Sequence, residues 1–213
     1  MRDSFQLRIV ASATPEPIIF IVDDEPAMRE ALGALFRSAH LHVHSFATVK
    51  EFLRYPRPDA PACLVLDVRL PEMSGLEFQQ QLARQGDDIP VIFISGHGDI
   101  PTSVRAMKAG AMEFLPKPFG DQEVLAAIHA ALQRDMKRRV GVGQFADMRL
   151  RYASLTPRER QVMSLVIRGM LNKQIAAQLG LSEITVKVHR RHVMDKMNAR
   201  SLAELVRMGD RVA

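Results

Sequence analysis

Short apolar segments alternate with amphipathic segments along the first part of the chain. The apolar segments cover residues 18–22, 42–46, 63–66, 91–94 and 112–115, and each has the length of a single strand. Apolar residues at helical spacing follow Pro26 and recur near residues 75–84, 101–109 and 121–132. Strands that alternate with helices in this way predict a doubly wound, flavodoxin-like α/β domain with a five-stranded parallel sheet.

Residues suited to phosphoryl chemistry stand at or just after the ends of four of these segments. They are, in chain order, Asp23, Asp24, Asp67, Ser95 and Lys117. In an open parallel sheet the carboxyl ends of the strands lie along one edge, and ligands bind in the crevice outside that edge. We therefore expect these side chains to converge in one site.

The expected site is a pocket for a metal ion and a phosphoryl group. Three close carboxylates repel one another, and Mg²⁺, which prefers oxygen ligands, would relieve that repulsion. Asp67 is the best placed nucleophile for an aspartyl phosphate, while Lys117 and the metal would offset charge on the transferred oxygens. The Ser95 hydroxyl would donate to one of those oxygens. Taken singly, each residue also fits a helix cap or an ordinary surface position, and only the whole set favours a site.

Charge is divided unevenly along the 213 residues. Residues 1–133 hold 12 Lys and Arg against 17 Asp and Glu, a net of −5, whereas residues 151–213 hold 12 against 5, a net of +7. Residues 134–150, with 5 against 2, add +3. A basic domain concentrates polyanions around itself, and nucleic acid is the usual one, although charge alone also fits a merely solvated surface.

The pattern of the basic residues 151–213 predicts a helix-turn-helix. Thr156, Pro157 and Glu159 form a capping-box pattern that starts one helix, and Gly169 follows it as an end signal. Further helices are expected at 172–179, 183–198 and 201–208, and a short helix with a tight turn into a longer one is the helix-turn-helix arrangement.

The 183–198 helix has two faces by spacing. The expected inward face comprises Ile184, Val186, Val193 and Met197, and the expected cationic side comprises Lys187, Arg190, Arg191 and Met194. An α-helix fits the major groove of B-DNA, where Lys or Arg can reach guanine and an apolar group can touch a thymine methyl. Asn172 and Lys173 begin the preceding helix, where backbone amides suit a phosphate.

The expected organisation is a tail at 1–16, an α/β domain at 17–133, a linker at 134–153 and a small all-α domain at 154–213. The linker contains the flexible Gly141 and Gly143 and is a candidate for helix at its start, so the sequence leaves a rigid helix and a flexible tether both open. The chain shows no secretory signal pattern and no apolar run of membrane-spanning length, so we expect a cytoplasmic protein without membrane contact. The single cysteine, Cys63, falls in a buried strand candidate, and we assign it no redox role.

The α/β part resembles the receiver domain of two-component response regulators over about residues 18–132. The motifs are Phe20-Ile21-Val22-Asp23-Asp24-Glu25, Leu64-Val65-Leu66-Asp67, Leu70-Pro71-Glu72-Met73-Ser74-Gly75 and Lys117-Pro118-Phe119. Residues 95–101 and 106–111 resemble the FixJ branch of the NarL/FixJ family in particular.

This resemblance implies phosphoryl transfer from a sensor histidine kinase to Asp67. The Mg²⁺ ligands it implies are Asp24, Asp67, Asp23 through water and the Arg69 backbone carbonyl. Ser95 and Phe114 would be the switch pair, and the 101–109 helix would lie in a face through which phosphorylated copies form a homodimer. Arg69 and His97 would flank the pocket and bear on phosphate lifetime, and the Lys117–Pro118 bond would be cis.

The basic part resembles the LuxR-type helix-turn-helix from Leu155 to about Met208. The motifs are Leu155-Thr156-Pro157-Arg158-Glu159-Arg160, Asn172-Lys173-Gln174-Ile175-Ala176 and Thr185-Val186-Lys187-Val188-His189. The resemblance implies base contacts from Lys187, Val188 and Arg191, further contact from Arg190, and DNA-backbone contacts from Asn172 and Lys173. His189 would pack inside the domain. Leu202, Leu205 and Val206 on the last helix would pair two DNA-bound copies.

The function expected from both parts is a phosphorylation-activated regulator that binds double-stranded promoter DNA as a dimer and activates transcription with RNA polymerase. It would be no independent enzyme, since a receiver catalyses only its own phosphorylation. Two alternatives stay open. One is a relay whose basic domain binds a protein partner, and the other is a regulator that works without phosphate, which the complete pocket disfavours.

Overall fold

The computed structural model describes residues 15–96 and 100–212. They fall into two compact units that divide between Arg139 and Val140, and each unit is described by itself. Within the described residues, no helix is long and apolar enough to cross a membrane.

The first unit is built on a parallel five-stranded sheet, as the sequence predicts. Its strands are β1 (Ile18–Val22), β2 (His42–Phe46), β3 (Ala62–Asp67), β4 (Val91–Ser95) and β5 (Glu113–Pro116). The strand order is β2-β1-β3-β4-β5, and all pairings are parallel. From β1 the strands are added first toward β2 on one side and then toward β3, β4 and β5 on the other. The switch point therefore lies between β1 and β3, and a crevice forms at such a point.

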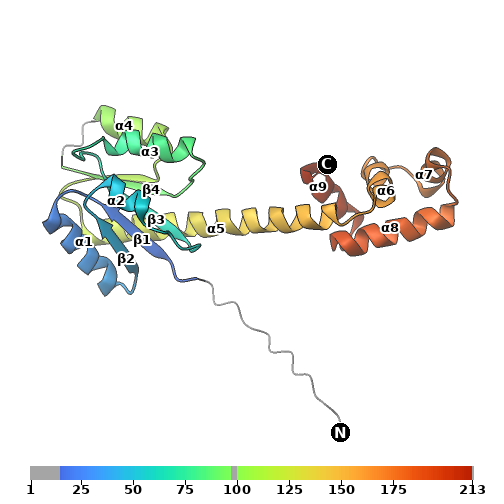
Figure 1. Cartoon of the computed structure of the whole chain (residues 1–213), viewed down its shortest axis with the longest axis horizontal. Coiled ribbons are helices and arrows are strands. Elements are labelled where there is room, and N and C mark those ends of the chain that lie inside the picture. Colours follow the sequence, from blue (N-terminus) through green and yellow to red (C-terminus); the bar gives the residue numbers. More distant parts are fainter. Residues whose placement is uncertain (1–14, 97–99, 213) are drawn as a thin grey trace, which may run out of the picture. The chain divides into compact units, whose positions relative to one another are not determined.

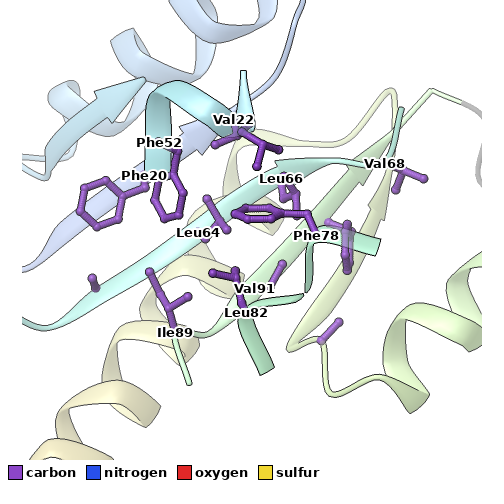
Figure 2. Close-up of a cluster of buried hydrophobic side chains, with 14 of the residues drawn as sticks. Phe20, Val22, Phe52, Leu64, Leu66, Val68, Phe78, Leu82, Ile89 and Val91 are labelled. Atoms are coloured by element: carbon purple, nitrogen blue, oxygen red, sulfur yellow. The ribbon is translucent and has the colours of Figure 1, made fainter. Parts of the chain in front are cut away.

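Helices cover both faces of this sheet (Figure 1). They are α1 (Pro26–Ser38), α2 (Val49–Arg54), α3 (Gly75–Arg84), α4 (Ile100–Lys108) and α5 (Asp121–Ala153). Side chains alternate between the faces of a strand, so Phe20 and Leu64 join the core under α2, α3 and α4, while Ile19 and Val65 join the core under α1 and α5. Figure 2 shows the first of these cores, in which Phe52 of α2 and Phe78 of α3 meet edge to face.

Helix α5 extends well beyond the expected end near residue 132. It runs to Ala153 and so includes the expected linker, for which the sequence left a rigid helix and a flexible tether both open. Most residues of this extension are good helix formers, and ion pairs one turn apart join Asp135 to Arg138 and Arg139, and Asp147 to Arg151. These local interactions outweigh the low helix propensity of Gly141 and Gly143.

The second unit contains four further helices. They are α6 (Pro157–Ile167), α7 (Asn172–Leu179), α8 (Glu183–Met197) and α9 (Leu202–Val212). The Thr156 side chain accepts a hydrogen bond from the Glu159 amide, and Glu159 accepts one from the Thr156 amide, which confirms the expected capping box. Gly180 ends α7 in the left-handed conformation, so the chain turns tightly into α8. Helix α9 runs four residues past its expected end at Met208.

Candidate functional site

Lys117 joins two buried carboxylates at the carboxyl edge of the sheet. Its Nζ lies 3.0 Å from Asp23 Oδ2 and 3.2 Å from Asp67 Oδ1. These residues come from the ends of β1, β3 and β5, and the Lys117 amide donates to the Ser95 carbonyl at the end of β4. The structure thus brings together residues separated by up to 94 positions, as the strand-end pattern predicts.

Backbone amides orient both carboxylates. Asp67 Oδ2 accepts a hydrogen bond from the Arg69 amide at 2.6 Å, and Asp23 Oδ1 accepts one from the Glu25 amide at 2.8 Å. The Asp23 carbonyl also accepts a hydrogen bond from the Arg29 guanidinium. The Asp23 and Asp67 carboxylates each accept hydrogen bonds from a backbone amide and from Lys117. Their positions are therefore fixed by contacts within the protein.

The pocket has an excess of negative charge. Burial raises the pKa of Asp67, and the charge of Asp23 raises it further, against the lowering effects of Lys117 and the Arg69 amide. Burial would lower the pKa of Lys117, but hydrogen bonds and charge from Asp23 and Asp67 raise it overall. Among the described residues of this pocket, one ammonium therefore faces two buried carboxylates, which leaves one negative charge in excess when both are ionised.

This donor set fits Mg²⁺. A divalent cation would balance the remaining charge, and Mg²⁺ binds one or two carboxylates while it keeps several waters. In the part of the chain that the structure describes, no three His, Cys, Asp or Glu side chains gather closely enough to hold a metal by side chains alone. Asp23 and Asp67 are buried, whereas Asp24, the next residue along the chain, is exposed.

The structure also describes most of the other residues that the receiver resemblance singles out. Ser95 is buried, and Phe114 is half-buried with its ring centroid 6.4 Å from that of Phe93. Arg69 is exposed, the Lys117–Pro118 bond is cis, and His97 lies outside the described residues.

The exposed residues of α8 are not all those that the sequence predicts. Ile184, expected to face inward, is 75% exposed, and the exposed side of the helix also carries Lys187, Val188 and Arg191. Arg190 and Met194, expected on the cationic side, are half-buried, and Met194 packs against the core of the unit. The inward face is centred on Val186, Val193 and Met197, which are all buried. The expectation for Ile184 was wrong because it weighed apolar character above helical angle.

Asn172 and Arg190 form a link between α7 and α8. Arg190 Nη1 donates to Asn172 Oδ1 at 2.7 Å, whereas Lys173 is exposed. His189 is half-buried, and its Nδ1 is buried without a hydrogen-bond partner among the described residues. The Asn172–Arg190 contact braces the angle between the two helices, which leaves Lys187, Val188 and Arg191 as the more accessible groups.

A buried carboxylate joins α6 to α8. Glu159 accepts a hydrogen bond from Lys196 Nζ at 2.6 Å and one from the Thr156 amide. Burial alone would raise its pKa, but these donors lower the pKa of Glu159 to about 2. The cluster therefore holds a charged Glu159 inside the unit.

Helix α9 corrects one further expectation. Leu205 is buried in the core of its own unit, and Val206 is half-buried, so only Leu202 of the expected pairing residues is exposed. A Cβ placed on Gly209 would lie 2.1 Å from Ile167 Cδ1, which shows how closely α9 packs against α6. Leu205 is therefore not exposed for contact with a second copy.

Sequence reasoning missed two structural roles in the first unit. Gly75 begins α3 where a Cβ would lie 2.3 Å from the Asp67 carbonyl oxygen, so any larger residue would push against the strand that holds Asp67. Gly75 belongs to a motif noted in the sequence, but its close approach is visible only in three dimensions. Asp135 is the second, and its contact with β3 has no signal in local sequence.

A sheet of this order with a carboxylate–lysine pocket at its switch point, in one chain with a helix-turn-helix, defines a class of proteins that couple phosphoryl signalling to nucleic acid. Comparison with known families supports this class for both parts of the chain. The family model described as "Response regulator receiver domain" matches residues 19–129, and that described as "Bacterial regulatory proteins, luxR family" matches residues 153–209. The chain belongs to the response regulators of two-component systems and carries a LuxR-type DNA-binding domain. It is a transcription regulator and not a conventional enzyme.

Several characterised proteins are similar over nearly the whole chain. Nodulation protein W of Bradyrhizobium diazoefficiens is 54% identical over 198 residues, which is 93% of this chain and 87% of that protein. Response regulator protein TodT of Pseudomonas putida is 49% identical, over 92% of this chain and 86% of that protein. The solved structure of the response regulator StyR is 50% identical, covers 92% of this chain and 99% of its own, and gives a TM-score of 0.83.

Proposed function

We propose that phosphorylation of Asp67 activates this regulator, which then binds promoter DNA as a homodimer and activates transcription. The observation that carries the proposal is the Asp67–Lys117–Asp23 cluster, in which a buried nucleophile lies 3.2 Å from an ammonium group. Supporting it is the exposed stripe of cationic and apolar residues on α8. The proposal keeps a receiver at 17–133, a linker at 134–153 and a DNA-binding domain at 154–213.

The chemical step is transfer of a phosphoryl group from a phosphohistidine of a sensor histidine kinase. An Asp67 carboxylate oxygen forms a bond to phosphorus as the phosphorus–nitrogen bond breaks, and the histidine nitrogen takes up a proton. Mg²⁺, when bound by Asp67, Asp24, the Arg69 carbonyl and Asp23 through water, would supply positive charge to the phosphoryl oxygens. Lys117 donates to those oxygens, because its Nζ already lies beside Asp67 Oδ1.

Phosphate on Asp67 would shift the receiver between two states. In the proposal, Ser95 contacts the phosphoryl group and Phe114 rearranges, which alters the face built by α4 and β5. Ile100, Val104 and Met107 are exposed at i, i+4 and i+7 on α4, so this helix offers an apolar stripe for a second copy. Dimerisation raises the effective concentration of paired DNA-binding domains.

DNA binding is assigned to α8 and the start of α7. Lys187, Val188 and Arg191 would contact bases, while Lys173 and Asn172 would contact the DNA backbone and position the domain. Arg190, bonded to Asn172, would support that positioning and add charge near the backbone. RNA polymerase is the proposed downstream partner, and the cytoplasm is the proposed location.

The deciding experiment measures mass and DNA binding together. Light scattering with Mg²⁺ and beryllofluoride, a phosphoryl mimic, should show conversion of monomer to dimer, and promoter selection should yield a two-half-site sequence. Asp67→Asn should abolish both responses, while Asp88→Asn, which removes an exposed carboxylate outside the pocket, should respond as the native chain does. Dimerisation and affinity that ignore the mimic would contradict control through Asp67. Equal competition by unrelated DNA would favour a protein partner for the basic domain.

A further inference from the structure

Ile184 occupies an unusual position for an isoleucine. It stands in the first turn of α8, and 75% of its surface is exposed, although the core of its own unit lies on the other side of the same helix. Successive residues of an α-helix are rotated by about 100°, which places Ile184 roughly opposite Val186, Val193 and Met197. All three of those residues are buried in the core. Ile184 therefore makes no contribution to that core comparable to theirs.

The neighbours of Ile184 on α8 are the groups proposed to contact bases. Lys187, Val188 and Arg191 follow it at i+3, i+4 and i+7, and all three are exposed. Val188 is 47% exposed, so two apolar side chains one turn apart alternate with two cations on a single stripe. The stripe therefore combines cations with two β-branched apolar residues, and both kinds of group suit the major groove.

The end of α8 that carries Ile184 is well ordered by local contacts. The Ser182 hydroxyl caps the helix by accepting a hydrogen bond from the Thr185 amide at 3.1 Å, and it lies 2.8 Å from the Thr185 hydroxyl. On a neighbouring part of the helix, Arg190 is held by Asn172. Ile184 is thus presented on a fixed turn, and its β-branched side chain loses little rotamer freedom when it is covered.

We infer that Ile184 is a specificity-determining residue that contacts the 5-methyl group of a thymine in the major groove. This inference rests on the proposed DNA-binding function and extends it to a residue that the proposal does not assign. An apolar side chain offers no donor or acceptor, so the thymine methyl is the feature of a base edge that it recognises best. The amino-terminal residues of a recognition helix are those that contact base edges. Val188 would contact the neighbouring part of the same groove.

The test removes a single methyl group from the DNA. A duplex selected by the native chain is prepared with deoxyuridine in place of thymine at one position at a time, because deoxyuridine lacks only the 5-methyl group. Binding is measured for the full-length native chain, Ile184→Ala and Ile184→Val. Leu150→Ala is the matched control, since Leu150 is also an exposed aliphatic residue, 72% exposed, but lies on α5.

We expect one thymine whose replacement weakens native binding by about fourfold per half-site, the effect of burying one methyl-sized group. Ile184→Ala should weaken binding to the thymine duplex by a similar or larger factor and should be insensitive to deoxyuridine at that position. Ile184→Val should be intermediate, and Leu150→Ala should keep the native sensitivity. Unchanged helix content by circular dichroism would show that Ile184→Ala is folded.

Two results would separate the inference from the proposed function. If the native chain selects a sequence but Ile184→Ala retains native deoxyuridine sensitivity at every thymine, Ile184 does not read a methyl group and the inference is wrong. If the native chain selects no sequence with or without beryllofluoride, the proposed function itself fails, and the inference fails with it.

Discussion

Asp135 Oδ2 accepts a hydrogen bond from the Ala62 amide at 3.0 Å, which joins α5 to the first residue of the strand that ends in Asp67. Asp135 is only 1% exposed, and Arg138 and Arg139 donate to its two oxygens. Arg139 also pairs with Asp59, just before β3. Burial alone would raise the pKa of Asp135, but these donors lower it, so the carboxylate is held in its charged form. This cluster anchors the fourth and fifth turns of α5 on the receiver.

Asp135→Asn should loosen that anchor. The substitution removes the charge that Arg138 and Arg139 share, and we expect the receiver to lose about 1–3 kcal/mol of unfolding free energy, less than for a fully buried pair because both arginines are partly exposed. Urea unfolding combined with hydrogen exchange of peptides covering 59–66 and 130–140 would measure it. Asp147→Asn, which breaks an exposed pair on the same helix, should cost less than about 0.5 kcal/mol. Equal effects of the two variants would argue against an anchor.

Replacement of Gly141 and Gly143 by alanine should stabilise the middle of α5. A Cβ at either position would meet no described atom within 4 Å outside its immediate helix surroundings, so no packing requires glycine there. Alanine favours the helix by about 0.5–1 kcal/mol per site. Amide exchange of a peptide covering residues 136–150 should therefore slow in the double variant. Gly180→Ala, at a φ of 64°, should instead destabilise the second unit, and unchanged exchange at 136–150 would show that the helix is not limited by its glycines.

The second unit should lose stability in acid because of Glu159. Its pKa in the folded chain, about 2, is lower than the ordinary value of 4.5, so its contribution is complete above about pH 4.5 and is lost as the pH falls toward 2. Glu159→Gln should cost about 1–3 kcal/mol at neutral pH and should flatten this acid dependence. Hydrogen exchange of peptides from residues 154–212, measured at several urea concentrations and pH values, would test it. Glu183→Gln, an exposed first-turn variant, should keep the native pH profile.

Lys173 and Lys187 should differ in how they affect DNA binding. Lys173→Ala removes a proposed phosphate contact, so it should weaken binding to all sequences alike and reduce the magnitude of the logarithmic salt slope by about 1. Lys187→Ala should also change which base is preferred at one position of each half-site. Fluorescence anisotropy across a salt series, with selected and scrambled duplexes, distinguishes the two effects. Lys50→Ala, on the exposed side of α2, provides a control that should leave the slope unchanged, and a base preference altered by Lys173→Ala would contradict its backbone role.

The receiver site could be predicted because its signal is periodic and local. Four of the five apolar runs end beside a residue of the site, and a parallel sheet must bring those ends to one edge, so Asp23, Asp67 and Lys117 converge as expected. The cap at Thr156 was equally predictable, since capping depends on residues three positions apart. The sequence could not predict that Asp24 is exposed, because its exposure depends on the direction of the chain after β1.

The sequence by itself determined the five strands, the helix-turn-helix, the strand-end pocket and the charge division, because each follows from short-range spacing and composition. Only the tertiary structure decided how α7 packs against α8, since that packing joins residues far apart in the chain, and it placed Arg190 against Asn172. Packing of α9 against α6 likewise buried Leu205. The Asp135–Ala62 hydrogen bond spans 73 positions, and such a contact exists only once the sheet and α5 have been brought together.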